Sequence, residues 1–406
     1  MRVLILGAGP AGLATATRLR ELAPRRDADV DITMLSTEPY PPYSPPAMAD
    51  HFLPGSDERL FWQGPDVCAR LAIDYRSGVA AAAVDCAACR VRLADGKALD
   101  YDELVIATGS RLYAPVAGND LDGIYNFKSL SAAEALVARI RSGEVETAVV
   151  VGAGFIGVEV ALLLRALGLA VTLVEQEAIM RHMLDAETAA YVQRALESRG
   201  IELRLRTHVK AFEDRGGRAV GVVTGDEELL PADVCVAATG IKPHTEFLTG
   251  SGIEFDWGVL ADETLATNLP HVWAAGDVAE TTDRVTGRRY VHAIWPNAEA
   301  QGRIIAERIL GYETVYEGAE IMNSLRHLGV PVIAAGEVAG GEELRVRRGD
   351  SLRKVILHDD RIVGFRLVGD VRGAGAYRAL MLRGTDVGPW RDELLEPGFG
   401  LTRLAA

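Results

Sequence analysis

The sequence predicts an α/β fold: two three-layer domains with parallel sheets, the second inserted into the first, and a small α+β domain near the C-terminal end. Three observations predict it. An apolar strand at 3–6 runs into a glycine-rich turn and a helix, the same order returns from 148, and two strand-like segments between 352 and 370 precede a helix. Strands that alternate with helices are typical of parallel sheets. A chain of 406 residues has room for two or three domains.

Composition and charge limit the class of protein. A hydrophobic content of 49% and a charged content of 25% are ordinary for a globular protein. No apolar run approaches the ~20 residues that a membrane-spanning helix needs. The first residues show no signal-peptide pattern, so we expect a cytoplasmic protein without a membrane partner. The net charge of −14 argues against a nucleic-acid partner, because phosphate contacts need clustered Lys and Arg.

The first strand–turn–helix unit begins with the apolar run 3–6, which is typical of a strand buried on both faces. Gly7, Gly9 and Gly12 follow, and a helix is expected to about Leu22. The first glycine permits a tight turn, the second lets the backbone approach a diphosphate, and the third lets helix pack on strand. The helix N-terminus offers N–H groups to the phosphates. The pattern therefore predicts a Rossmann-like nucleotide-binding domain.

The next strand of this unit, Asp31–Leu35, has no acid directly after its last apolar residue. An acid at that place usually binds the ribose of a dinucleotide. Either Ser36 or Glu38 is close enough in sequence to do so, and the sequence leaves the choice open.

The second unit repeats the pattern more regularly. The apolar run 148–151 leads into Gly152, Gly154 and Gly157, then into a helix and a strand that Glu175 closes. A carboxylate there hydrogen-bonds the adenosine ribose and repels a 2′-phosphate. The second site is therefore predicted to prefer NADH to NADPH.

Two strands end in the same small-residue turn, Ala-Thr-Gly, at 107–109 and at 238–240. Both are expected to lead into chain crossings between the domains, because glycine lets two backbones pass closely. The predicted domains are 1–113 and 245–313 for the first nucleotide domain, 114–244 for the second, and 314–406 for the C-terminal domain.

A later strand carries Gly276 and Asp277 at its carboxyl end, where ligands of parallel sheets bind. An aspartate there suits a polyol hydroxyl, although a turn or helix-capping role is the alternative. A further helix is expected from Trp295 to about Leu310, with Pro296 in its first turn. Its N-terminus offers N–H groups to the electron-rich edge of a reduced flavin.

Taken in order, the glycine turns, the Ala-Thr-Gly turns and the segment 273–277 resemble the pyridine nucleotide–disulfide oxidoreductase superfamily, over 1–313. Within it, the segments 39–45 and 295–298 are similar to the branch of rubredoxin reductases, ferredoxin reductases and nitrite-reductase flavin subunits. The C-terminal hairpin and helix resemble the small C-terminal domain of rubredoxin reductases. The resemblance implies FAD in the first domain and NADH in the second, with the nicotinamide stacked on the flavin.

The resemblance also assigns residues. Glu159 stands at the place of a family glutamate near the reactive flavin edge and is the candidate catalytic residue; an exposed helix carboxylate is the alternative. The candidate cofactor-binding residues are Gly7, Gly9, Pro10, Ala11, Gly12, Ser36, Glu38, Val79, Ala107, Thr108, Gly109, Gly152, Gly154, Phe155, Ile156, Gly157, Glu175, Gly240, Gly276, Asp277, Pro296, Asn297 and Ala298.

Two departures from the family change the expected chemistry. Where NADH oxidases and coenzyme A–disulfide reductases of this superfamily carry a redox cysteine, the segment 45–49 has no thiol, and no Cys-x₄-Cys occurs. Sulfur is therefore not the expected relay. Asp50 stands where ferredoxin reductases carry a lysine that pairs with the equivalent of Glu159, and two carboxylates would repel each other.

Three further features have two interpretations each. Cys86 and Cys89 are either turn cysteines or a redox or metal pair, and no second pair or histidine lies near them in sequence to complete a metal site. The basic stretch 345–354 is either a solvated hairpin face or a docking patch for an acidic electron carrier. His292 is either buried in the core or close to the flavin.

The sequence thus predicts an FAD-dependent NADH:acceptor oxidoreductase, which passes electrons to an external carrier such as a ferredoxin, a rubredoxin or an iron–sulfur subunit of a larger complex. One alternative is an NADH oxidase that releases hydrogen peroxide. The other is a non-catalytic protein that binds FAD as a redox sensor. No metal ion is expected, and the sequence leaves the oligomeric state open.

Overall fold

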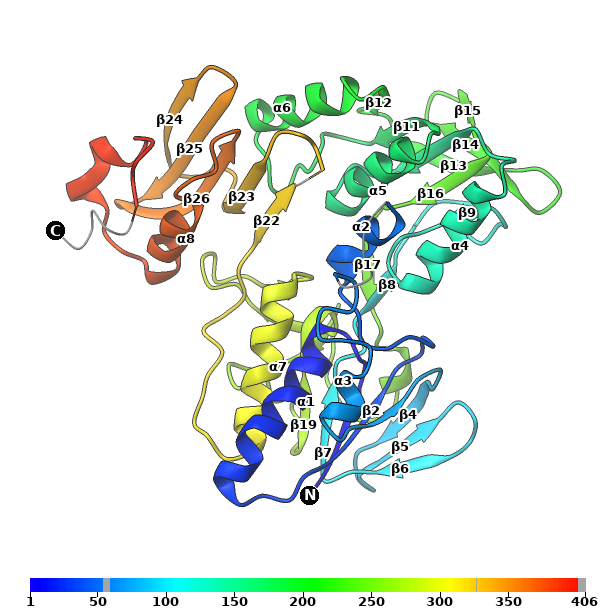
Figure 1. Ribbon diagram of the computed structural model, residues 1–406, viewed down its shortest axis with the longest axis vertical. Helices are drawn as coiled ribbons and strands as arrows, with labels where there is room; N and C mark the ends of the chain where they lie inside the picture. The colour runs from blue at the N-terminus through cyan, green and yellow to red at the C-terminus, as the bar shows by residue number, and fades with distance from the viewer. Residues whose placement is uncertain (54–58, 326, 401–406) are drawn as a thin grey trace. The chain divides into compact units, whose positions relative to one another are not determined.

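The computed structural model describes residues 1–53, 59–325 and 327–400 (Figure 1). The chain forms two compact units. The first contains residues 1–111 and 241–320, and the second contains residues 112–240 and 321–406.

The first unit is built on a parallel sheet in the order β19-β7-β1-β2-β3. Its edge strand β19 comes from the part of the chain that follows residue 240, so the sheet is completed only when the chain returns to this unit. The strands are β1 (Arg2–Leu6), β2 (Asp31–Leu35), β3 (Asp74–Arg76), β7 (Glu103–Ile106) and β19 (Val272–Ala274).

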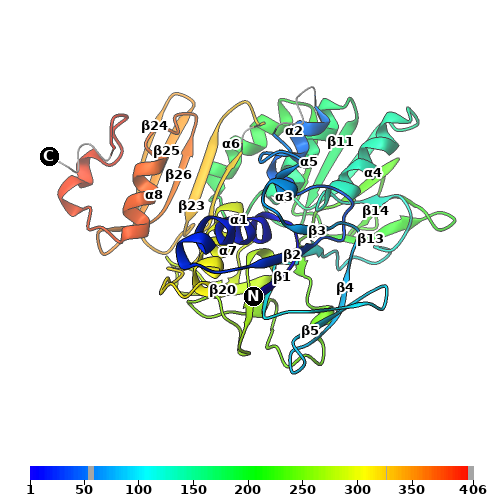
Figure 2. The same cartoon turned by 60° about the horizontal axis from the view of Figure 1, so that its bottom comes forward.

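Strand β1 is buried on both faces, as its continuous apolar run predicts. Val3 and Ile5 pack against helices α1 (Pro10–Leu22) and α7 (Trp295–Ile309), which lie side by side in both ribbon views (Figures 1 and 2). Leu4 and Leu6 face the opposite side and join the apolar residues of a three-stranded antiparallel sheet. That sheet contains β4 (Ala81–Asp85), β5 (Arg90–Leu93) and β6 (Ala98–Asp100). These are the three layers that the sequence predicts.

Smaller elements complete the first unit. They are α2 (Met48–Phe52), α3 (Val67–Arg70), β18 (Val259–Leu260), β20 (Ala279–Thr282) and β21 (Arg289–Val291).

The second unit repeats the parallel arrangement, in the order β12-β11-β10-β16-β9. One face of β10 packs on the antiparallel sheet β13-β14-β15, and helix α5 packs on β10 and β11. The parallel strands are β9 (Ile124–Tyr125), β10 (Thr147–Val151), β11 (Ala170–Glu175), β12 (Ile201–Leu205) and β16 (Val234–Ala237). The other elements are α4 (Leu130–Arg141), α5 (Phe155–Ala166), α6 (Ala186–Glu197), β13 (Val209–Asp214), β14 (Ala219–Thr224) and β15 (Leu229–Pro231).

The C-terminal part of this unit is an antiparallel sheet in the order β22-β23-β26-β25-β24, followed by helix α8 (Ala374–Arg383). The predicted hairpin is confirmed, with its turn at Asp359 and Asp360. The strands are β22 (Met322–Leu325), β23 (Val332–Gly336), β24 (Glu342–Arg348), β25 (Ser351–His358) and β26 (Arg361–Val368). The predicted fold class, two Rossmann-like folds and a small α+β C-terminal part, is therefore confirmed.

The two segments in which the chain passes from one unit to the other are paired as strands. β8 (Ser110–Leu112) and β17 (Ile241–Pro243) pair as a two-stranded sheet directly after the two Ala-Thr-Gly turns. The two segments thus pair after the turns, although a Cβ would meet no described atom within 4 Å at Gly109 and only the Tyr113 carbonyl oxygen, at 3.9 Å, at Gly240, so neither glycine is required by a close approach.

The basic stretch 345–354 is only partly a solvated hairpin face, because the side chains of Arg345, Arg347 and Arg348 are 63%, 57% and 47% exposed whereas its last two basic residues are buried. Arg353 and Lys354 are 5% and 3% exposed, although both were expected on a solvated hairpin face or a docking patch. Arg345 and Arg347 form ion pairs with Glu187 of helix α6, so their charge is also partly used within the unit. Arg353 and Lys354 therefore hold the fold, while the other three basic side chains remain on the surface.

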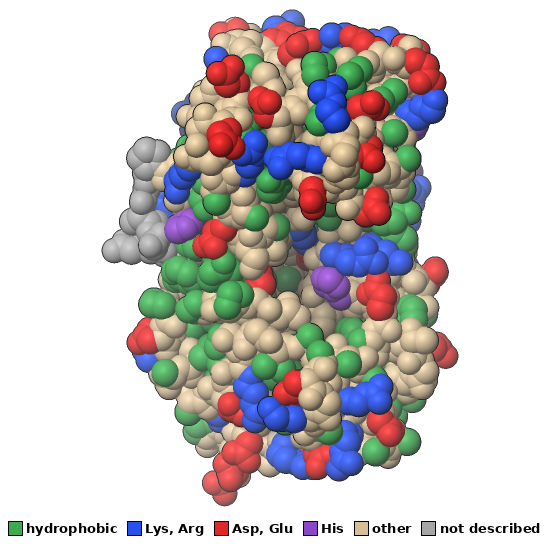
Figure 3. Space-filling model, turned by 90° about the vertical axis from the view of Figure 1, so that its right-hand side faces the viewer, with side chains coloured by type: hydrophobic (Ala, Val, Ile, Leu, Met, Phe, Trp, Pro, Cys, Tyr) green, Lys and Arg blue, Asp and Glu red, His purple; other side chains and the backbone are tan. Residues whose placement is uncertain are grey.

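The surface is mixed in charge. On the face drawn in Figure 3, basic and acidic side chains are interspersed among those coloured, and they form no broad basic area. Across the part of the chain that the structure describes, no helix combines the length and apolar character that crossing a membrane requires.

Candidate nucleotide and electron-transfer site

The first glycine turn has the geometry of a diphosphate cradle. Gly7 has φ +116°, and a Cβ added there would overlap the carbonyl oxygen of Ala107. A Cβ added at Gly12 would overlap the carbonyl oxygen of Gly7. Beside Gly9, by contrast, no described atom lies within 4 Å of the place where a Cβ would stand. Packing therefore requires the first and third glycines, while the second faces space that a ligand can enter.

The second glycine turn repeats this geometry. A Cβ at Gly152, where φ is +103°, would lie 2.5 Å from the carbonyl oxygen of Ala238, and one at Gly157 would overlap the carbonyl oxygen of Gly152. Space is again open beside Gly154. The residues present thus fit two dinucleotides, one in each unit.

The helices that follow these turns start without a side-chain cap. Helix α1 begins after Gly9 and α5 after Gly154, and no side chain in the described ranges caps either of them. In α6, by contrast, the Asp185 carboxylate accepts hydrogen bonds from the N–H groups of Glu187 and Thr188, at 3.0 and 3.2 Å. The first-turn N–H groups of α1 and α5 are therefore suited to phosphate oxygens.

Glu175 is held beside the second turn by backbone donors. Its Oε2 accepts a hydrogen bond from the N–H of Ala153 at 2.8 Å, and its Oε1 accepts one from the N–H of Glu177 at 3.0 Å. The carboxylate therefore lies at the end of β11 and next to the glycine turn.

In the first unit, the structure brings Ser36, Glu38 and Val79 together. The N–H of Val79 donates to the carbonyl oxygen of Ser36 at 2.8 Å, and the Ser36 hydroxyl accepts the N–H of Glu38 at 3.2 Å. The hydroxyl of Tyr43 donates to the Glu38 carboxylate at 2.6 Å. Tyr43 thus orients the Glu38 carboxylate.

The turn at Gly276 and Asp277 lies against the N-terminal ends of α1 and α7. A Cβ at Gly276 would lie 3.2 Å from that of Ala11 and 3.7 Å from that of Ala298. The Ser110 hydroxyl donates to the Asp277 carboxylate at 2.9 Å. Candidate residues from three distant segments therefore converge within the first unit.

Gln301 was not predicted, although it holds this turn. Its Oε1 accepts the N–H of Gly276 at 2.7 Å, and the residue is 2% exposed. The signal in the sequence was weak: Gln301 follows Asn297 by one helical turn, so two amides share one face of α7. The Asn297 side chain itself faces inward, where it exchanges hydrogen bonds with the backbone of Glu320.

The remaining candidates lie at the crossings and at helix starts. Thr108 donates its hydroxyl hydrogen to the carbonyl oxygen of His244 at 3.2 Å, and Gly109 accepts the N–H of His244 at 3.0 Å. Gly240 accepts the N–H of Tyr113 at 2.9 Å. Pro296, Phe155 and Ile156 stand in the first turns of α7 and α5.

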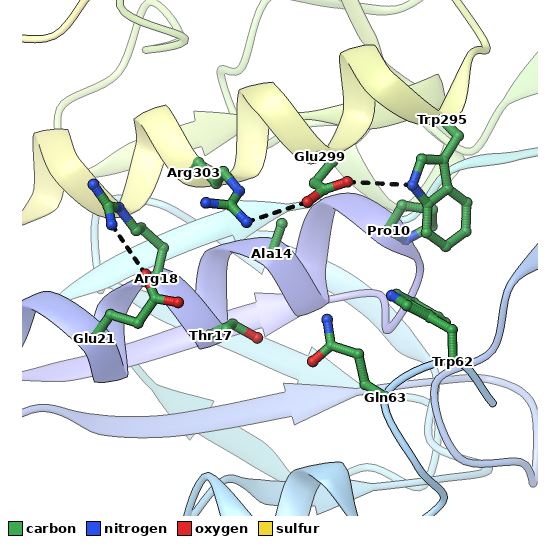
Figure 4. A pocket seen from close by; sticks show the side chains of 10 residues that line it. All are labelled: Pro10, Ala14, Thr17, Arg18, Glu21, Trp62, Gln63, Trp295, Glu299 and Arg303. Atoms are coloured by element: carbon green, nitrogen blue, oxygen red, sulfur yellow. Dashed lines mark hydrogen bonds and ion pairs between the residues drawn. The ribbon is translucent and has the colours of Figure 1, made fainter.

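A shallow groove on the outer side of α1 and α7 is a separate feature (Figure 4). The rings of Trp62 and Trp295 meet edge to face there, 4.7 Å apart. Glu299 lies between the indole N–H of Trp295 and the guanidinium of Arg303, both at 3.3 Å. Of the candidate cofactor residues, Pro10 alone lines this groove.

His292 is buried in the core, one of its two predicted places. It is 4% exposed, and its Nε2 lies 3.2 Å from the Asp283 carboxylate. Burial opposes the charge of Asp283, but hydrogen bonds from His292, Thr286 and Val285 hold its pKa below the ordinary value.

Two of the four cysteines are buried in the cores of the units. Burial raises the pKa of Cys68 and of Cys235 to about 11. Cys86 and Cys89 are free and lie in the turn between β4 and β5. No three His, Cys, Asp or Glu side chains of the described residues are grouped to hold a metal ion.

Glu159 is not an exposed helix carboxylate. Its side chain is 15% exposed, and its Oε2 lies 2.7 Å from Nδ1 of His327. His327 is in the same unit but 168 residues away in sequence, and the sequence did not predict it as a partner. Asp50, on α2 of the first unit, lies 3.4 Å from Arg59.

Comparison with known proteins gives consistent matches. The family model described as pyridine nucleotide-disulphide oxidoreductase matches residues 1–302. The NADH-dependent phenylglyoxylate dehydrogenase subunit epsilon of Aromatoleum evansii is 30% identical over an alignment of 406 positions, gaps included. The alignment covers 97% of this chain and 94% of the relative. The ferredoxin–NAD(+) reductase component of the anthranilate 1,2-dioxygenase system of Burkholderia cepacia is 31% identical over an alignment of 413 positions, which covers 98% of each chain.

Solved structures agree with these relatives. The ferredoxin reductase for the CYP199A2 system from Rhodopseudomonas palustris superimposes with a TM-score of 0.89 at 26% identity, and the match covers 100% of both chains.

Proposed function

Because the chain belongs to the pyridine nucleotide-disulphide oxidoreductase family, whose members bind FAD and NAD(P)H, we propose that it is an FAD-dependent NADH:acceptor oxidoreductase that delivers electrons to an external carrier. The observation that carries the proposal is the pair of glycine turns. Each has two glycines that packing requires, a third that faces open space, and an uncapped helix behind it. FAD, when bound, supplies a hydride acceptor that can release electrons one or two at a time.

The residues of the first unit bind and orient FAD in this proposal. The N–H groups that start α1 hold its diphosphate, Glu38 binds the adenosine ribose, and Asp277 binds a hydroxyl of the ribityl chain. Ser110 and Gln301 keep the Asp277 turn in place.

The residues of the second unit bind NADH. The start of α5 holds the diphosphate, and Glu175 hydrogen-bonds the adenosine ribose. Two backbone N–H groups hold its carboxylate in place. The negative charge of the carboxylate also repels a 2′-phosphate. We therefore propose a preference for NADH over NADPH.

The proposed acceptor is an iron–sulfur carrier. The thiols of Cys68 and Cys235 are buried with raised pKa values, so the chain offers no sulfur relay there. The names of two relatives support two forms of this acceptor. One relative is named as a reductase of a ferredoxin, and the other is named as a subunit of a larger dehydrogenase, in which another subunit would be the acceptor.

Anaerobic stopped-flow spectroscopy tests the proposal. We expect NADH to bleach the flavin absorbance of the purified protein, and an oxidised Rieske-type ferredoxin, whose potential lies well above that of plant-type ferredoxins, to restore it faster than oxygen added in a separate run. A colourless protein that takes up no FAD would contradict the proposal. Faster reoxidation by oxygen, with release of hydrogen peroxide, would instead support the NADH oxidase alternative.

A further inference from the structure

We propose that His327, in the turn after β22, is a positioning residue of the nicotinamide site, because its hydrogen bond fixes the Glu159 carboxylate beside NADH bound at the start of α5. The inference rests on the proposed function, since it requires NADH at the second glycine turn. It adds to that function a residue from the C-terminal part of the chain.

The contact itself is short and shielded. His327 Nδ1 and Glu159 Oε2 are 2.7 Å apart, with side-chain exposures of 31% and 15%. Hydrogen bonds that involve an ionised group are the strong ones, and shielding from water strengthens them further. An exposed surface pair contributes little, but this one fixes a carboxylate that is mostly removed from water.

Glu159 is placed to meet the nicotinamide half of NADH. It lies one helical turn after Phe155, the first residue of α5, so both side chains project from the same face of the helix. A dinucleotide whose diphosphate lies at the start of α5 places its adenosine ribose at Glu175. Its nicotinamide half then runs the other way, past the face of α5 that carries Phe155 and Glu159.

The C-terminal sheet that precedes and follows His327 in sequence is joined to the second nucleotide fold. Strand β22 pairs with β23 along its whole length. β26, the other neighbour of β23, carries the fully buried Arg366, which donates to the carbonyl oxygens of Met183 at 2.9 Å and Ala335 at 3.0 Å. The bond to Met183 ties the C-terminal sheet to the second nucleotide fold, to which Glu159 belongs.

The experiment compares variants of the FAD-loaded full chain. His327→Ala removes the donor, and His327→Asn retains one, because the Asn amide nitrogen stands where Nδ1 does. His327→Gln places its nitrogen at the position of Nε2 instead. His358→Ala, at an exposed histidine on β25, is the matched control. Readouts are the limiting rate of flavin reduction by NADH, the Kd of NAD⁺ by calorimetry, the FAD content and the Tm.

We expect His327→Ala to lower the limiting rate about tenfold or more, since a slightly misplaced group near the reacting atoms has effects of this size. It should also weaken NAD⁺ binding. His327→Asn should recover most of both losses, whereas His327→Gln should not. FAD content and Tm should stay near those of the His358→Ala control.

A double-mutant cycle tests the route through Glu159. If His327 acts by holding that carboxylate, then Glu159→Gln combined with His327→Ala is no slower than Glu159→Gln alone. Losses that multiply in the double variant would overturn the inference. So would a His327→Ala variant that matches the wild type, or one whose losses follow a lower Tm and are not recovered by His327→Asn.

The two proposals fail in different ways. If NADH does not reduce the flavin of the wild-type protein, the proposed function fails and this inference with it. If the wild type is reduced but the His327 variants are unaffected, only this inference fails.

Discussion

At the scale of single residues, the Glu175 carboxylate has two separable properties, its acceptor oxygens and its charge. Its oxygens hold the N–H groups of Ala153 and Glu177, and its charge is what would exclude a 2′-phosphate. Glutamine removes the charge and retains one of the two acceptor oxygens, so Tm is measured beside coenzyme choice to detect any change in the loop.

We therefore predict that Glu175→Gln lowers the preference for NADH over NADPH about tenfold or more, because a like-charge contact is removed. The measurement is the ratio of kcat/KM for the two coenzymes. Glu202→Gln, on the neighbouring strand β12, is the control. An unchanged ratio would show that Glu175 does not meet the ribose.

Gln301 leads to a second prediction at this scale. Gln301→Leu leaves the buried N–H of Gly276 without its acceptor, which costs about 1–3 kcal/mol. We expect faster loss of FAD on dilution, followed by the rise of flavin fluorescence. Gln63→Leu, in the groove of Figure 4, should retain FAD as the wild type does.

At the scale of elements, the glycine turns were predictable because their signals are local. The predicted helix ends agree with those of α1 and α7 to within a residue, since each helix has its signals within its own sequence. The glycine spacing likewise anticipates which glycines pack tightly and which one is open.

These turns allow a matched pair of variants. Gly12→Ala should destabilise the first unit, because its Cβ would overlap the carbonyl oxygen of Gly7. Gly9→Ala adds a methyl group where no described atom lies within 4 Å, so it should fold and yet bind FAD poorly. Tm without FAD and FAD content with it distinguish the two. Equal losses of Tm in both variants would contradict the assignment.

The hairpin β25–β26 shows what a local pattern cannot predict. Neighbouring residues of a strand point to opposite faces, and here both faces are covered. The Arg353 guanidinium donates hydrogen bonds to the carbonyl oxygens of Glu396 and Arg372, and the Lys354 ammonium donates one to the Asp185 carboxylate. The sequence predicts the strand but not these distant partners, so the charges were wrongly placed in solvent. His327 and Gln301 were missed for the same reason.

At the scale of the whole molecule, the C-terminal sheet forms one compact unit with the second nucleotide fold. Lys354 lies 2.8 Å from Asp185 and 2.8 Å from Glu187, both at the start of α6. Burial disfavours the ammonium, but hydrogen bonds to the two carboxylates raise the pKa of Lys354. Burial also opposes the charge of Asp185, yet the bonds from Lys354 and Thr188 lower its pKa.

We predict that Lys354→Met lowers the stability of this unit by about 1–3 kcal/mol, because partly shielded carboxylates lose their partner. The contribution of Asp185 is present above its ordinary pKa of 3.8 and is lost as the pH falls through its lower folded value. That of Lys354 is lost only as the pH rises through a pKa above 10.5. Denaturant unfolding from pH 2 to 11 should show the largest difference from wild type near neutrality. Lys210→Met, at an exposed ion pair, is the control.

The place of β19 at the edge of the first sheet has a consequence during synthesis on the ribosome. The partner of β7 on that side is not made until Val272–Ala274 has been translated, whereas the parallel sheet of the inserted fold is complete once residue 237 has left the exit tunnel. The edge of β7 in the nascent N-terminal segment therefore stays unpaired, while the parallel sheet of the second nucleotide fold, which is synthesised later, is completed first. The growing chain is most exposed to chaperones, and to pairing with other nascent chains, during this interval.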